Sequence, residues 1–89
     1  MSEGKLMAEQ ARGERAAALL REPLITESFD ALEEKYIDGW KNSSSTEGRE
    51  TLFQMYQALM VVRGHLTEVV ETGNLAKLEI NLQRNPKRR

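Results

Sequence analysis

The chain has 89 residues, no cysteine, one histidine and a formal net charge of −1. A chain this short forms at most one small domain and buries only about 60–65% of its unfolded surface, so its core is marginal unless a partner helps. The lack of cysteine excludes a disulfide staple. With a single histidine, it also excludes a structural zinc site, which needs about four nitrogen or sulfur ligands.

Two further absences bear on where the chain works. No stretch approaches the roughly 20 apolar residues of a membrane span. The first residues, MSEGKLMAEQARGER, lack the apolar core of a signal peptide. We therefore expect a soluble intracellular protein without a membrane contact, and we expect no cofactor.

The first predicted helix covers about residues 5–21, KLMAEQARGERAAALLR, which is rich in strong helix formers. Its apolar face consists mainly of alanine, and Gly13 weakens it. Pro23 then suits the first turn of a new helix, where its missing N–H costs nothing.

The second predicted helix covers about residues 23–41. Its apolar side chains recur every three or four residues, as one helical face requires: Ile25, Phe29, Leu32, Tyr36 and Trp40. Acidic side chains occupy the opposite face: Glu27, Asp30, Glu33, Glu34 and Asp38. The following NSSSTEG ends this helix, because short polar side chains favour turns and caps. Ser44, Ser45 or Thr46 can cap the next helix, and Ser44 with Glu47 has capping-box spacing.

The third predicted helix covers about residues 46–72. It carries a heptad seam, which is a row of apolar side chains at alternating spacings of three and four residues: Leu52, Met55, Leu59, Val62, Leu66 and Val69. Gly73 is predicted to stop the helix as a glycine able to adopt positive φ. Beyond it, NLAKLEINLQRN fits either a short helix at 75–83 or a strand, and we favour the helix because nothing else in the chain offers a sheet. Pro86 and its neighbours at 83–89 read as a basic tail.

The sequence thus predicts an all-α fold in a single domain, residues 1–82. The loop between the second and third helices is so short that it forces them into an antiparallel hairpin, to which the N-terminal helix is added. The hairpin cannot hide all of its apolar surface, so we expect an oligomer. The expected self-association or partner surface combines the seam with two aromatic residues of the loop end: Leu52, Met55, Leu59, Val62, Leu66, Val69, Trp40 and Tyr56.

Other polar residues and glycines of the sequence are weaker candidates for a site. His65 and Glu68 stand three apart, but the di-metal pattern of helix bundles has the reverse order and further inward carboxylates, so we expect no metal site. The serines of SSST have no base within reach, and no Gly-rich phosphate loop is present, so we expect no catalytic residues and no enzymatic activity. Gly64 and Gly39 lie inside predicted helices, where each suggests the close approach of another backbone.

The basic end of the chain is the candidate contact with nucleic acid or with an acidic partner. It comprises Arg84, Lys87, Arg88 and Arg89. Four charges can neutralise a few phosphates, but no aromatic side chain is interleaved for base stacking. A solvated terminus is the commoner explanation of such a run, and protein contact is the favoured mode of binding.

Residues 31–76 resemble small helical proteins of tailed double-stranded DNA bacteriophages. The similarity lies in an acidic helix ending in Tyr36 and Trp40, a TEGRE turn at 46–50, and a long helix closing on TGNLA at 72–76. The resemblance implies a virion, assembly or packaging accessory rather than an enzyme, in the cytoplasm of the infected host cell or in the virion. Its partners would be further copies or another phage or host protein. An oligomeric inhibitor or sequestering protein acting against host defence is the alternative, though no matching motif is found.

Overall fold

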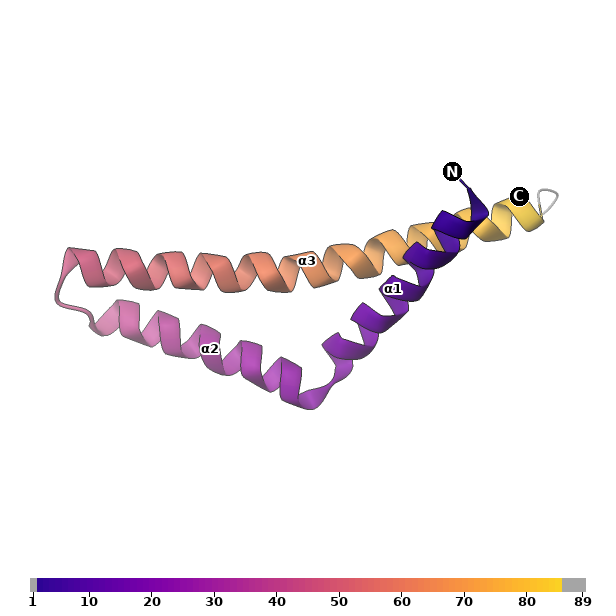
Figure 1. The fold of residues 1–89 in the computed structure, drawn as a ribbon. Coiled ribbons are helices and arrows are strands. Elements are labelled where there is room, and N and C mark those ends of the chain that lie inside the picture. Colours follow the sequence, from indigo (N-terminus) through magenta and orange to yellow (C-terminus); the bar gives the residue numbers. More distant parts are fainter. Residues whose placement is uncertain (1, 86–89) are drawn as a thin grey trace. The chain divides into compact units, whose positions relative to one another are not determined.

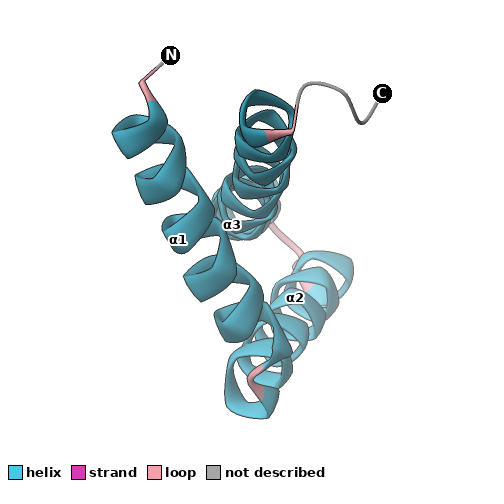
Figure 2. Ribbon diagram, turned by 90° about the vertical axis from the view of Figure 1, so that its right-hand side faces the viewer, coloured by secondary structure: helices cyan, strands magenta, loops and turns pink. Residues whose placement is uncertain are grey.

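The computed structural model describes residues 2–85. It consists of three helices, α1 (Glu3–Arg21), α2 (Pro23–Asn42) and α3 (Thr46–Arg84), with no strand among the described residues (Figures 1 and 2). The all-α prediction is confirmed, and the first two helices begin and end within two residues of the predicted positions.

The junction between α1 and α2 follows from Pro23. A residue before proline is pushed out of the helical region, and Glu22 accordingly has φ −70° and ψ 119°. The same residue is the N-cap of α2, because its carboxylate accepts a hydrogen bond from Leu24 N at 3.3 Å. Pro23 itself occupies the first turn of α2, as predicted.

The start of α3 is capped by Ser45. Its hydroxyl accepts a hydrogen bond from Gly48 N at 2.9 Å, which satisfies one of the donors that a helix N-terminus leaves unpaired. Of the three candidate caps, Ser45 is therefore the one used, and the capping box of Ser44 with Glu47 does not form.

The chain divides into two compact units that share α3. The hairpin unit is Arg21–His65, in which α2 lies antiparallel to the first half of α3 (Figure 1). The terminal unit, as far as it is described, joins residues 2–20 to residues 66–85, so α1 packs on the second half of α3.

The terminal unit has a small buried core made of Leu6, Ala76 and Ile80. Beside it, α1 and α3 approach each other at a pair of glycines. A Cβ added to Gly13 would lie 2.7 Å from Gly73 Cα, and a Cβ added to Gly73 would lie 2.7 Å from Gly13 Cα. Real Cβ atoms essentially never come this close to backbone, so only glycine fits at either position.

The prediction that Gly73 stops α3 is wrong. The helix continues to Arg84, and no glycine among residues 2–85 has a positive φ. Gly73 is buried in mid-helix because α1 needs the room that a side chain would take. The ambiguous segment 75–83 is helical, as favoured, but it belongs to α3 rather than to a separate element.

In the hairpin unit, Gly39 allows a side chain of α3 to pack closely on α2. A Cβ there would lie 3.1 Å from Leu52 Cδ1, so the close approach expected at Gly39 is real but involves a side chain, not a backbone. At Gly64 no atom of the described chain lies within 4 Å of an added Cβ, so the close approach expected there does not occur inside the chain.

Candidate protein-interaction site

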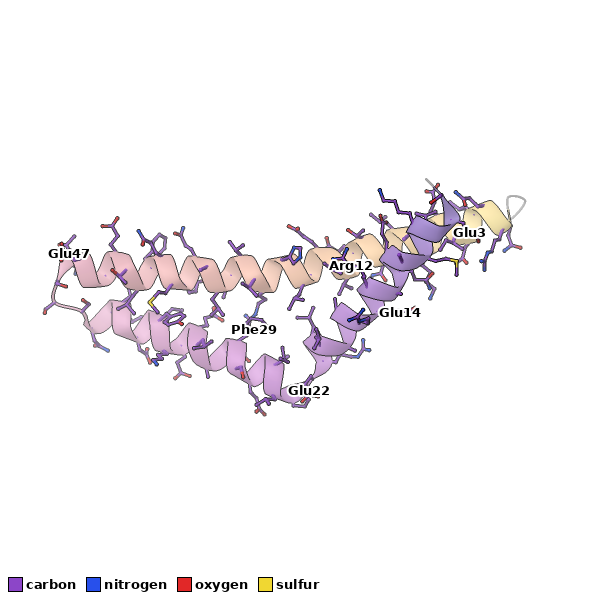
Figure 3. The ribbon with its side chains drawn as sticks, viewed as in Figure 1. Glu3, Arg12, Glu14, Glu22, Phe29 and Glu47 are labelled. Atoms are coloured by element: carbon purple, nitrogen blue, oxygen red, sulfur yellow. The ribbon has the colours of Figure 1, made fainter. Side chains whose placement is uncertain are left out.

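A polar cluster around Arg63 joins the two helices of the hairpin unit. The Arg63 guanidinium donates from Nη2 to Asp30 Oδ1 at 2.9 Å and from Nη1 to Glu33 Oε2 at 3.3 Å. Its Cζ also lies 5.0 Å from the centre of the Phe29 ring, within the range of a cation–π contact. Phe29 lies on the side of α2 that faces α3 (Figure 3). One basic residue of α3 thereby fixes the register of α2.

This cluster changes the predicted polarity of α2. Glu33, assigned from the sequence to the outer acidic face, is half-buried against Arg63. Leu32, assigned to the inner face, is 37% exposed. The side of α2 that faces α3 is therefore rotated slightly towards Glu33, because a half-buried carboxylate is acceptable where a guanidinium meets it.

No residue of the hairpin unit, residues 21–65, reaches the degree of burial found in the terminal core. Several of its large apolar side chains are instead well exposed, among them Leu24 at 66%, Val61 at 71% and Val62 at 54%. Single exposed apolar residues are normal on a protein surface, but several on one small unit make it a candidate interaction surface.

Near the loop end, exposed side chains of both helices line an apolar hollow of about 220 Å³, here called the aromatic groove. It is lined by Tyr36, Ile37, Trp40, Leu52, Phe53 and Tyr56. Trp40 and Phe53 are 46% and 49% exposed, so both rings are accessible from outside. Aromatic side chains that line an open groove are typical anchors for a protein partner.

A second hollow of about 250 Å³, the aliphatic groove, is lined by Tyr36, Met55, Ala58, Leu59 and Val62. On α3, Phe53 and Met55 are separated by about 160° around the helix axis. The two grooves therefore open on different sides of the hairpin, with Tyr36 between them.

The structure separates the eight residues predicted to form one interface into three groups. Three are half-buried within the hairpin unit: Leu52, Tyr56 and Leu59. Three are exposed there: Trp40, Met55 and Val62. The last two, Leu66 and Val69, are half-buried and belong to the terminal unit.

The basic end of the chain is only partly described. Arg84 lies in the last turn of α3, so the predicted tail beginning at residue 83 starts inside the helix. Its Nη2 and Nε lie 2.6 Å and 2.7 Å from Glu3 Oε1, an ion pair that joins α3 to α1. Lys87, Arg88 and Arg89, the other residues of the predicted contact, lie outside the described residues.

Residues 2–85 contain no cluster of three or more potential metal ligands. None of the helices described there has an apolar run long enough to cross a bilayer. The two apolar grooves of the hairpin unit are the candidate binding features.

No protein-family model matches the chain, and neither a curated protein nor a solved structure is significantly similar to it.

Proposed function

We propose that the protein is a non-enzymatic accessory of phage assembly that acts through helical protein–protein contacts. One observation carries the proposal: the hairpin unit leaves an open aromatic groove on a scaffold with no deeply buried side chain. A scaffold of that kind is completed by a partner rather than by its own core. The resemblance of residues 31–76 to phage proteins is the reason for assigning this contact to phage assembly.

The partner best suited to this groove is a helix with an apolar stripe. An amphipathic helix lays its apolar face into a hydrophobic groove and anchors it with side chains three or four residues apart. Trp40 and Phe53 offer rings on which such anchors pack. The partner in this proposal is therefore a protein, and its binding to the groove involves no catalysed reaction.

The proposal is tested by deleting the gene from the phage that carries it and counting finished particles. We expect fewer particles at unchanged DNA replication, and full rescue by the wild-type gene. Phe53→Asp places a charge in the groove without touching a core, and we expect it to fail to rescue. Leu24→Asp is the matched control, because Leu24 is exposed and lines neither groove. Rescue by both variants, or normal particle yield after deletion, contradicts the proposal.

The competing nucleic-acid function is tested separately, by asking whether DNA co-purifies with the protein. If the basic end binds DNA, the full chain co-purifies with DNA from infected cells and a chain lacking residues 86–89 does not. Recovery of DNA in that pattern would replace the assembly role by a packaging role. The ion pair of Arg84 with Glu3 gives that side chain a structural partner, which weighs against its use as a phosphate contact.

A further inference from the structure

The aliphatic groove belongs to a pattern that runs along α3. Two rows of side chains repeat every seven residues. One comprises Met55, Val62, Val69 and Ala76, and the other comprises Leu59, Leu66, Gly73 and Ile80. Both rows begin in the hairpin unit and continue into the terminal unit.

In the terminal unit these rows form a helix–helix interface. Ala76 and Ile80 are 2% and 5% exposed and form the core with Leu6 of α1. The carbonyl oxygen of Val69 would lie 3.1 Å from a Cβ added to Gly13. The second half of each row is therefore covered by a helix, α1.

In the hairpin unit only the first of these rows is open, because Leu59 of the second row is half-buried. Met55 and Val62 are 42% and 54% exposed. Ala58, between them on the same side of the helix, is exposed as well. The exposed residues Met55 and Val62 thus belong to the same heptad row of α3 whose members Val69 and Ala76 pack against α1 within the terminal unit.

The absence of charged side chains around this surface limits the kinds of partner that can cover it. Residues 51–62, TLFQMYQALMVV, contain no charged side chain. Such a segment offers nothing to attract a strongly charged peptide or a nucleic acid, and two copies of it do not repel each other. A small residue in the middle, Ala58, lets two helices approach closely.

We propose that the aliphatic groove is a homodimer interface, in which α3 of one chain packs antiparallel on α3 of a second copy. A two-fold axis between Ala58 and Leu59 places Met55 of each chain against Val62 of the other, so that one surface is complementary to itself and the assembly closes at two chains. The inference deepens the proposed function by naming a second copy as the partner at one of the two grooves.

Sedimentation equilibrium on the full chain tests the proposal. The wild type is expected at twice its monomer mass of 10.2 kDa. Val62→Glu is expected to raise the dimer dissociation constant by about 100-fold or more, because a charge is buried against Met55. Val61→Glu is the matched control: the neighbouring valine is 71% exposed and does not line the groove, so the dimer is expected to persist. A monomeric wild type, or equal effects of the two substitutions, overturns the proposal.

Cross-linking tests the geometry even if Val62→Glu unfolds. The chain has no cysteine, so a single introduced thiol reports one contact. Ala58→Cys lies next to the proposed axis and is expected to form a disulfide-linked dimer under mild oxidation, whereas Val61→Cys is expected to remain largely unlinked. Equal cross-linking of the two variants contradicts the antiparallel α3 contact.

The two proposals fail in different ways. A dimer sensitive to Val62→Glu, together with normal particle yield after gene deletion, supports this interface and rejects the assembly role. Loss of particles on deletion, with a monomeric protein, rejects this interface and leaves the assembly role standing through the aromatic groove.

Discussion

Replacing Gly13 by alanine tests how closely α1 and α3 approach in the terminal unit. The added Cβ would lie 2.7 Å from Gly73 Cα and 3.1 Å from the Val69 carbonyl oxygen. Carbon atoms pack at about 3.5–4.0 Å, so the two helices have to separate by roughly 1 Å. Gly64→Ala is the matched control, because nothing lies within 4 Å of a Cβ at that position.

The two substitutions share one energetic term and differ in another. Both gain the helix propensity of alanine, so Gly64→Ala is expected to raise the free energy of unfolding by about 0.5–1 kcal/mol. At Gly13 this gain is opposed by overpacking, which costs about 1–3 kcal/mol. A separation of about 1 Å forfeits up to half of the dispersion energy of the contacts that Leu6 makes with α3. Because the propensity terms cancel, the difference between the variants is the packing cost alone, about 1–3 kcal/mol.

Urea unfolding followed by circular dichroism measures this difference. Hydrogen exchange of the α1 amides assigns it to the terminal unit, since those amides are expected to exchange faster in Gly13→Ala and not in Gly64→Ala. If the two variants have the same free energy of unfolding, the backbones of α1 and α3 do not meet at the glycine pair, and the reasoning is refuted.

Three further predictions concern the hairpin unit. Arg63→Met removes two ion pairs and a cation–π contact, and is expected to cost about 1 kcal/mol. Because the ion pairs are partly exposed, this loss should shrink in urea titrations at high salt. Ser45→Ala removes the N-cap of α3 and should cost about 1 kcal/mol, whereas Ser44→Ala should change thermal stability by less than about 0.5 kcal/mol. Trp40, the only tryptophan, is 46% exposed, so its fluorescence emission should shift to shorter wavelength when a protein partner fills the aromatic groove, but not in Phe53→Asp.

The hairpin was predictable because its signals are local. Pro23 fixes the start of α2, short polar side chains mark the loop, and apolar residues at spacings of three and four give each helix a face. The interface predicted from these patterns includes residues that line the two grooves, among them Trp40, Tyr56, Met55 and Val62, but not Tyr36, Phe53 or Ala58. What the patterns did not give is the rotation of α2 on α3, which decides which of these side chains stay exposed.

Two features needed information from distant parts of the chain. A glycine that ends a helix and a glycine that admits a neighbouring helix have the same local sequence, and Gly73 is identified only by its contact with Gly13. The role of Arg63 was missed because a charged residue on an apolar helix is usually assigned to solvent. Its position offered a signal: it is the only charged side chain between residues 51 and 67, and it lies seven residues after Tyr56, on the face that meets α2.

The way the terminal unit is assembled has a consequence for folding on the ribosome. Its contacts join distant residues, with Glu3 and Arg84 lying 81 positions apart, whereas the hairpin forms from neighbours in sequence. Local contacts close faster than distant ones, so the unit without a deep core forms first. α1 is synthesised first, but it can pack only after the last part of α3 has been synthesised. Its packing face, formed by Leu6, Gly13 and Ala16, is small enough to leave little apolar surface open to other chains until then.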